Sequence, residues 1–389
     1  MSSEGVVERG AFRARLHHYA SSNRIVGVDV ARGLAVLGMF AAHLGVSDEF
    51  VFGEPDTWLD LANGRSSILF AVLAGFSIAL ISGRIVPVSG VPLVQARIRI
   101  FARAAMIFAL GGLLEFLGTQ VAVILPAYAV LFVLALPFLT WIPRRLLTLA
   151  AILAVVMPIV LATIRPFFEL GAPSAIVDLM ITGHYPAMIW IVFVLVGLAL
   201  GRADVSKPAT AAKIALTGVA LTVVGYGIGL AVAEPVSATA TAPLAGTTMQ
   251  LGNVAELLTI EPHSGSPFEV IGSTGFVLGV LGVCLLATPY ARWVLFPLAS
   301  VGAMALTAYS VHIVGIAVHG DIVGTLDDNS LLLVFVLSAL IGCSLWTLLI
   351  GRGPLEQLLT RVSHLAARIT TVGAGRLDAD PTSKEYTQK

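Results

Sequence analysis

The first long apolar run of the chain carries three ionisable side chains, Asp29, Arg32 and His43, among Leu, Val, Ala, Met and Phe. A helix places Arg32 and His43, about three turns apart, on nearly the same face with about 16 Å between them along the axis. Asp29 lies close enough to Arg32 to pair with it. Imidazole can take up or release a proton near neutral pH, so this alignment on one helix face predicts a catalytic His43 with Asp29 and Arg32 toward the other end of the helix. A salt bridge and an interhelical hydrogen bond would explain the same residues without catalysis.

The composition places this chain in a membrane. Hydrophobic residues make up 57% of its 389 residues and charged residues only 12%, whereas soluble proteins have about 25% charged residues. Runs of roughly 20 apolar residues recur, each long enough to cross a hydrocarbon core of about 30 Å. The sequence therefore predicts an all-α, polytopic membrane helix bundle with ten spans, near residues 25–46, 66–83, 99–117, 121–141, 146–164, 184–201, 211–233, 268–289, 297–319 and 330–351.

The distribution of charge predicts the orientation. Lys and Arg gather on one side of the predicted spans and Asp and Glu on the other. Because cytoplasmic loops are enriched in Lys and Arg, we expect both termini in the cytoplasm and a multi-pass protein of the plasma (inner) membrane. The predicted parts are a cytoplasmic N-terminal segment (1–24), a transmembrane domain (25–351), an amphipathic interfacial helix (352–370) and a disordered cytoplasmic tail (371–389).

Several stretches of the chain resemble membrane acyltransferases. Arg32-x10-His43 is similar to the arginine–histidine signature of acyltransferase family 3, and the opening RIVGVDVARGLAVLGMF resembles the heparan-alpha-glucosaminide N-acetyltransferase catalytic region and its bacterial relatives. Uncharacterised bacterial membrane proteins of the YeiB type are similar to the stretches NGRSSILFAVLAGFSIAL (63–80), GHYPAMIWIVFVLVGLALGR (183–202) and LFPLASVGAMALTAYSVH (295–312). The resemblance implies transfer of an acetyl or other acyl group from cytoplasmic acyl-CoA, the donor substrate, to an acceptor outside.

The resemblance also suggests what binds where. Arg97, Arg99 and Arg103, at the cytoplasmic start of the third predicted span, would hold the phosphates of acetyl-CoA, for which arginine is well suited. The enrichment of cations on the cytoplasmic side explains the same arginines without a ligand. The expected acceptor is a carbohydrate or a lipid-linked hydroxyl or amine; membrane lipid and a homodimer are the expected partners, and no metal or nucleic acid is expected.

The residues predicted to bind the acceptor lie near the outer ends of the spans, and they are Asn63, Arg65, His184, Tyr185 and His312. The dipole of a helix disfavours a cation at its N-terminus, so Arg65 needs a partner: Asp56 or Asp60, or an anionic acceptor. Two further histidines, His263 and His319, are expected to be interfacial residues without a role in the site.

One departure from the resemblance keeps alternatives open. In the glucosaminide N-acetyltransferases the catalytic histidine follows the first span, and the matching segment here, 47–65, contains none. Either His43 takes that role from within the span, or this branch has lost the chemistry. A glycine-rich chain with 38 Gly and charges inside its spans is also compatible with a secondary transporter or a flippase for lipid or envelope precursors. A non-enzymatic subunit of a cell-envelope complex is a third hypothesis.

Overall fold

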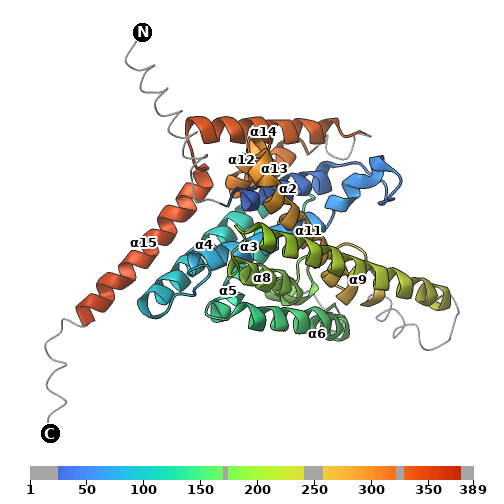
Figure 1. Ribbon diagram of the computed structural model, residues 1–389, viewed down its shortest axis with the longest axis horizontal. Coiled ribbons are helices and arrows are strands. Elements are labelled where there is room, and N and C mark those ends of the chain that lie inside the picture. The colour runs from blue at the N-terminus through green and yellow to red at the C-terminus, as the bar shows by residue number, and fades with distance from the viewer. Residues whose placement is uncertain (1–24, 170–173, 241–256, 321–327, 378–389) are drawn as a thin grey trace, which may run out of the picture.

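The computed structural model describes residues 25–169, 174–240, 257–320 and 328–377, and these ranges contain helices and no strand (Figure 1). In chain order the elements are α2 (Val26–Leu44), η1 (Pro55–Ala62), α3 (Arg65–Ile81), α4 (Gly90–Glu115), α5 (Leu125–Leu134), η2 (Leu136–Phe138), α6 (Pro143–Glu169), α7 (Ala175–Val177), η3 (Asp178–Thr182), α8 (Ala187–Gly201), α9 (Pro208–Ala240), α11 (Pro267–Ala291), α12 (Phe296–Ala303), α13 (Ala305–Val318), α14 (Ser330–Leu349) and α15 (Pro354–Leu377). The predicted segment 1–24 and residues 378–389 of the predicted tail lie outside the described residues. Helix α15 continues past the predicted boundary at residue 370.

Within the described residues, five helices are long and apolar enough to cross a membrane, or up to eight spans if each bent helix pair counts as one. The prediction of ten spans is therefore not confirmed. The apolar run near 121–141 folds as the 10-residue α5 followed by the short η2, and the run near 297–319 bends by 83° between α12 and α13. A hydropathy pattern measures apolar character and does not detect such breaks. The orientation of the termini stays a prediction.

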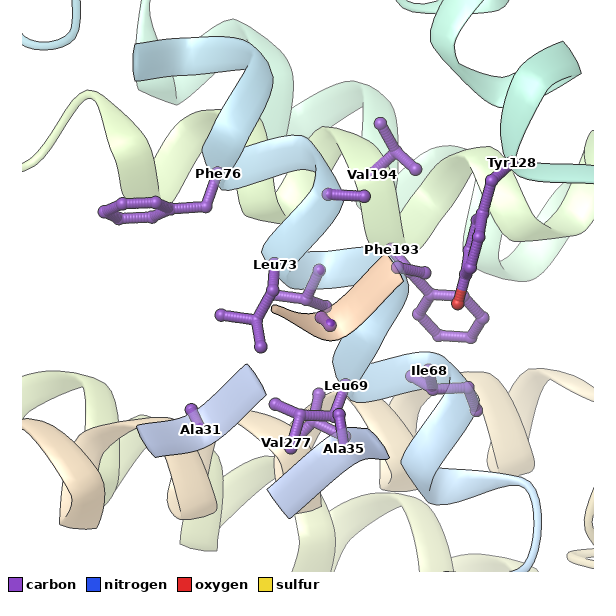
Figure 2. Packing of buried hydrophobic residues seen from close by; sticks show 14 of the residues in the cluster. Ala31, Ala35, Ile68, Leu69, Leu73, Phe76, Tyr128, Phe193, Val194 and Val277 are labelled. Carbon is purple, nitrogen blue, oxygen red and sulfur yellow. The ribbon is translucent and has the colours of Figure 1, made fainter. Parts of the chain in front are cut away.

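Helices α2, α3, α8 and α11 form the buried centre of the bundle. Their contact surfaces carry small residues that let backbones approach closely, as is common between membrane helices. A Cβ atom added at Gly197 of α8 would lie 1.8 Å from the carbonyl oxygen of Val72, and one at Gly75 of α3 would lie 2.1 Å from that of Val194. Figure 2 shows the result: Leu69 and Leu73 of α3 lie among buried side chains from neighbouring helices. The packing of these helices fixes the positions of their ends, where the candidate site lies.

The periphery of the bundle is apolar and exposed. In the most apolar 18-residue stretch of each helix, only 22% is buried in α6 and in α9, and only 11% is buried in α14. In a membrane these surfaces face lipid, which requires no polar covering. Helix α15 packs along α4 and leads away from the bundle (Figure 1).

A buried arginine fixes one end of α8. Arg202, which follows the last residue of the helix, donates to the carbonyl oxygens of Ser82 (3.2 Å), Arg84 (2.6 Å) and Leu139 (2.5 Å) and to the Ser82 hydroxyl (2.9 Å). A cation is favourable at a helix C-terminus, where it interacts with the dipole and with backbone carbonyl groups. Arg202 thus ties α8 to the segments that follow α3 and α5.

Candidate functional site

A cavity of about 580 Å³ opens where α2, α4 and α13 end and α3 and α8 begin. Its walls include His43 from the last turn of α2, Asn63 from the segment before α3, and His184 and Tyr185 from the turn before α8. The sequence predicts all four as site residues on one side of the membrane, and the structure brings them around a single cavity. We call this part of the molecule the histidine end.

His312, another predicted site residue, lies directly against His43. His43 Nδ1 and His312 Nε2 are 3.1 Å apart, and the two rings are nearly parallel with their centres 5.3 Å apart. The His312 ring is 1% exposed and is stacked on Phe40 at 4.0 Å, while the Phe335 ring meets it edge-on. This packing holds the His312 ring in place, and the contact between nitrogens then orients His43.

His43 can present either a bare nitrogen or an N–H group to the cavity, depending on which histidine of the pair donates the hydrogen bond between them. A neutral imidazole has one N–H and one bare nitrogen. When His43 Nδ1 donates to His312 Nε2, His43 presents a bare Nε2 that can accept a proton or attack a carbonyl group. When His312 Nε2 donates instead, His43 presents an N–H that can stabilise an oxyanion. His312 therefore decides which nitrogen of His43 carries the proton.

His263, expected to be an interfacial residue, lies in the same cavity. Its ring centre is 4.0 Å from that of His184, and its Nδ1 is buried without a hydrogen-bond partner in the described part of the chain. Its φ of 63° is a left-handed conformation that few non-glycine residues adopt. Burial and, secondarily, the nearby His184 and His43 lower the pKa of His263 to about 3, so the imidazole is neutral at pH 7. Its sequence context, Pro-His-Ser-Gly, marks a turn but does not reveal what the turn contacts.

The histidines do not form a metal site among the described residues. No group of three or more His, Cys, Asp or Glu side chains there is arranged to hold a metal ion.

The N-terminal turn of α3 forms another wall of the cavity. Gly64 precedes the helix with a φ of 68°, and no side chain caps it. The Ser66 and Ser67 hydroxyls donate backwards, to the carbonyl oxygens of Ala62 (2.6 Å) and Gly64 (2.7 Å). The positive end of the helix dipole at this turn favours negative charge in the adjoining space.

Arg65, in the same turn, is directed away from the cavity, whose lining does not include it. Its Nε donates to the Tyr226 hydroxyl of α9 at 3.0 Å. The guanidinium carbon lies 5.1 Å from the centre of the Tyr226 ring and 5.7 Å from that of Phe276 in α11. Arg65 is thus packed between α9 and α11, in the range of a cation–π contact.

The Tyr226 hydroxyl links Arg65 to further polar groups inside the bundle. It lies 2.7 Å from the Ser273 hydroxyl, which donates to the buried Glu269 carboxyl group at 3.1 Å. The expectation that Asp56 or Asp60 pairs with Arg65 is wrong, because helices distant in the sequence meet the first turn of α3 and supply its partners. Contact between Arg65 and an acceptor is not supported by this geometry.

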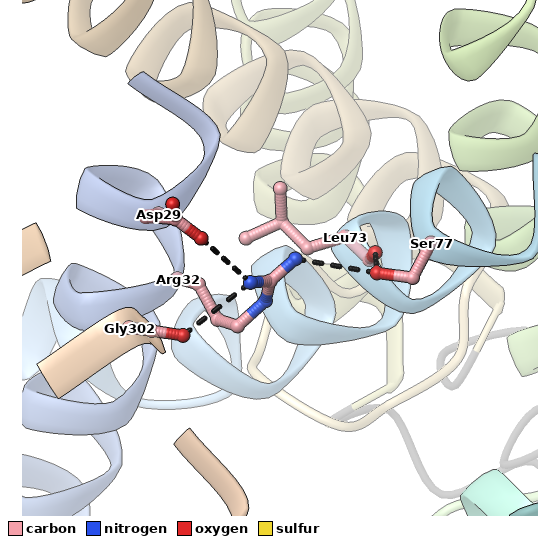
Figure 3. A network of polar contacts seen from close by, with 5 residues as sticks. All are labelled: Asp29, Arg32, Leu73, Ser77 and Gly302. Atoms are coloured by element: carbon pink, nitrogen blue, oxygen red, sulfur yellow. Dashed lines mark hydrogen bonds and ion pairs between the residues drawn. The ribbon is translucent and has the colours of Figure 1, made fainter. Parts of the chain in front are cut away.

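The predicted pair of Asp29 and Arg32 is present in the structure (Figure 3). Arg32 Nη1 lies 3.0 Å from Asp29 Oδ1 and 3.3 Å from the Gly302 carbonyl oxygen, and its Nη2 lies 3.2 Å from the Ser77 hydroxyl. Asp29 is 6% exposed. A single guanidinium group therefore joins α2, α3 and α12, as is typical of the bidentate chemistry of arginine.

A second, smaller cavity of about 200 Å³ lies at the other end of the same helices. It is lined by Arg32 of α2, Arg103 of α4 and Glu356 of α15, and we call this part the arginine end. Arg103 Nε is buried without a hydrogen-bond partner in the described residues. Of the three predicted coenzyme-binding arginines, Arg103 lines this cavity, whereas Arg97 and Arg99 do not.

Helices α2, α3 and α13 each line both cavities at different heights, and we call the buried residues between these heights, down to the wall of the smaller cavity, the buried layer. Tyr309 of α13 and Tyr128 of α5, both 2% exposed, belong to this layer. The Tyr128 hydroxyl donates to the carbonyl oxygen of Ser67 (2.7 Å), and the backbone N–H of Ile124 donates to the Tyr309 hydroxyl (3.4 Å). The residues of this layer are not evident from sequence spacing, because their contacts are between distant helices.

Comparison with known families gives two matches. The family model described as heparan-alpha-glucosaminide N-acetyltransferase, catalytic, matches residues 24–233, more than half of the chain, and includes Arg32 and His43. The model described as a protein of unknown function (DUF418) matches residues 204–366 and includes His312. No curated protein and no solved structure matches the chain. The two matched segments thus each supply one member of the histidine pair.

Proposed function

Because this chain belongs to the heparan-alpha-glucosaminide N-acetyltransferase catalytic family, we propose that it transfers an acetyl or other acyl group from acyl-CoA to a hydroxyl or amine. The observation that carries this proposal is the pair of His43 and His312, with Nδ1 and Nε2 3.1 Å apart, in which His43 lines the larger cavity. Acyl transfer from a thioester requires a group that takes the proton of the acceptor or carries the acyl group itself. His43 Nε2 can take the proton or carry the acyl group when His43 Nδ1–H donates a hydrogen bond to His312 Nε2.

In the proposed reaction His43 Nε2 takes the proton as the acceptor oxygen or nitrogen attacks the thioester carbonyl carbon. The carbon–sulfur bond breaks, the coenzyme leaves as a thiolate, and the proton held by His43 can pass to that sulfur. The first turn of α3 supports the oxyanion that forms on the carbonyl oxygen, because the positive end of its dipole faces the cavity. If His43 carries the acyl group instead, the same Nε2 attacks first and the acceptor attacks second.

The arginine end is the proposed donor site. Arg103, beside the smaller cavity, has a guanidinium nitrogen without a hydrogen-bond partner in the described part of the chain, and arginine suits the phosphates of coenzyme A. Arg32 and His43 are about 16 Å apart along α2 by helix rise, and we propose that the pantetheine arm covers this distance. The buried layer at Tyr128 and Tyr309 would have to part for the thioester to pass.

We further propose that the donor arrives from the cytoplasm and that the acceptor is an envelope sugar or lipid on the other side of a plasma (inner) membrane. The asymmetry of Lys and Arg in the sequence supports this orientation. Because residues 47–65 contain no histidine, we propose that His43, which lines the cavity and contacts His312, takes over the catalytic role.

The test is an assay of the purified protein with acetyl-labelled acetyl-CoA in lipid nanodiscs. Release of free coenzyme A together with label on a lipid or added acceptor supports the proposal. Two cavities at opposite ends of one helix bundle would also suit a transporter or flippase, so proteoliposomes without coenzyme A are measured in parallel. Substrate movement there without any acyl transfer would contradict the proposal, and neither activity would favour a non-enzymatic subunit.

A further inference from the structure

An apolar groove of about 560 Å³ runs between α13 and α14. Small side chains keep it open, and those on its lining are Ala308, Gly315, Ser338, Ala339 and Gly342. Its lining positions on α14 extend from residue 334 to residue 346, which corresponds to about 18 Å at 1.5 Å per residue. One leaflet of a hydrocarbon core about 30 Å thick has a similar depth of about 15 Å.

The groove exists because α14 packs on α12 and α2 and hardly touches α13. Only 11% of the most apolar 18-residue stretch of α14 is buried, a smaller share than in any other candidate span among the described residues. Figure 1 shows α14 along one edge of the bundle. In a membrane this edge is surrounded by lipid chains, so hydrocarbon is what covers the groove.

The groove leads to the histidine pair. His312 forms part of its wall, and the other side of the pair, His43, lines the larger cavity. The last turns of α13 separate the two spaces: Gly315 and His319 line the groove, whereas Ile316 and Ala317 line the cavity. A molecule with its chain in the groove can therefore place a polar headgroup around the end of α13, next to His43.

We propose that the α13–α14 groove binds the hydrocarbon chain of the acceptor, which makes the acceptor a membrane lipid whose headgroup carries the hydroxyl or amine. This assignment rests on the proposed acyltransferase function. A water-soluble acceptor would gain nothing from an apolar groove beside His312, whereas burial of a hydrocarbon chain contributes favourable free energy with each methylene. Phe40 and Phe335, which pack against the His312 ring, also line the groove.

The chain offers a matched pair of variants. A Cβ atom added at Gly342 of α14 meets no atom of the described residues within 4 Å, so Gly342→Phe fills the groove without displacing described backbone. Gly227 of α9 has equally open surroundings and does not line the groove, so Gly227→Phe is the control for a bulky residue on a lipid-facing helix.

The experiment uses a dodecyl glucoside with a photoreactive diazirine in its chain, added to the full-length protein in nanodiscs, with adducts mapped by mass spectrometry. We expect adducts on α13 and α14 that excess dodecyl glucoside suppresses and methyl glucoside does not. Gly342→Phe should weaken binding about tenfold, or about 1.4 kcal/mol, and Gly227→Phe should leave it unchanged. Adducts spread evenly over α6, α9 and α14, or unaffected by Gly342→Phe, would overturn the proposal.

Acyl transfer is measured separately with labelled acetyl-CoA and the membrane lipids of the nanodisc. Loss of transfer in Gly342→Phe but not in Gly227→Phe supports the assignment of the groove to the acceptor. Normal transfer in Gly342→Phe, despite lost labelling, would overturn that assignment. Groove labelling without transfer in any variant would contradict the proposed acyltransferase function while the groove itself remained a lipid site.

Discussion

The two ends of the bundle differ in the kind of polar group that they bury. At the histidine end, neutral rings, amide and hydroxyl groups surround a cavity of about 580 Å³. At the arginine end, a cavity of about 200 Å³ is lined by the charged residues Arg32, Arg103 and Glu356. Neutral imidazole suits proton and acyl transfer, whereas fixed cations suit the binding of an anion. The difference supports our proposal that chemistry and donor binding are divided between the two ends.

Two of the charged side chains at the arginine end, Arg32 and Glu356, have partners within the protein. Arg32 is paired with Asp29, and the Glu356 carboxylate accepts from the Thr307 backbone N–H at 3.0 Å and from its hydroxyl at 2.6 Å. Helix α15 is thereby attached to the start of α13. Among the described residues that line this cavity, Arg103 is the cation whose Nε has no hydrogen-bond partner and so has bonding capacity to offer a ligand.

The largest effect is expected at the histidine end. His43→Ala should lower kcat for acyl transfer about 10²–10⁴-fold, because general-base or nucleophilic assistance is lost. Expression and thermal stability should change little. The control is His364→Ala, which alters an exposed histidine on α15. Retention of more than about a tenth of the activity, equivalent to about 1.4 kcal/mol, would show that His43 is not catalytic.

At the arginine end the main effect should be on stability. Arg32→Leu removes the cation that lies 3.0 Å from the buried Asp29 carboxylate, and breaking a buried ion pair typically costs about 3–5 kcal/mol. The double variant Asp29→Asn, Arg32→Leu should be more stable than Arg32→Leu alone. Melting temperatures in detergent give this comparison, and additive losses in the double-mutant cycle would contradict direct coupling between the two side chains.

His312 should have a smaller effect than His43, because it positions the catalytic ring. His312→Phe preserves stacking on Phe40 but removes Nε2, and we expect about a tenfold loss of kcat, or about 1.4 kcal/mol. His312→Gln keeps a hydrogen-bonding group and should retain more activity, with a pH profile closer to that of the unmodified protein. Equal activity of both variants would mean that the contact at 3.1 Å does not orient His43.

Arg103→Ala should affect donor binding alone. We expect KM for acetyl-CoA to rise about threefold with kcat nearly unchanged, as for a residue that binds substrate and transition state equally. Arg97→Ala is the matched control, since Arg97 is exposed on the same helix and does not line the cavity. Equal effects of the two substitutions would indicate a general electrostatic contribution.

The smallest effect is expected from His263. Its pKa is about 3 in the folded protein and about 6.5 when unfolded, so the unfolded state binds more protons between these values. Its contribution to stability is therefore complete above about pH 6.5 and declines as the pH falls toward 3. His263→Asn should reduce the drop in melting temperature between pH 7 and pH 5. An unchanged pH dependence would contradict this neutral, buried state.

Local spacing was sufficient to predict part of the site. The pairing of Asp29 with Arg32 follows from helix geometry, and so does the common face of Arg32 and His43, because both depend on neighbouring turns. The gathering of Asn63, His184 and Tyr185 near His43 follows from predicted helix ends on one side of the membrane.

Contacts between distant segments could not be predicted in this way. His43 and His312 are 269 residues apart, and no local pattern fixes the register of α2 against α13. The partners of Arg65 come from α9 and α11, and the ring of His263 enters the cavity through a left-handed turn. The number of spans is not confirmed for a related reason: apolar runs predict burial in lipid, but they do not reveal breaks such as the one at Met304 between α12 and α13, which depends on packing.

The division of labour between the two ends is tested most directly by the side from which the donor acts. Sealed vesicles of known orientation receive membrane-impermeant labelled acetyl-CoA on one face at a time, and acyl transfer is measured. The account predicts transfer when acetyl-CoA meets the arginine end and none when it meets only the histidine end. Transfer supported only from the histidine end would contradict it.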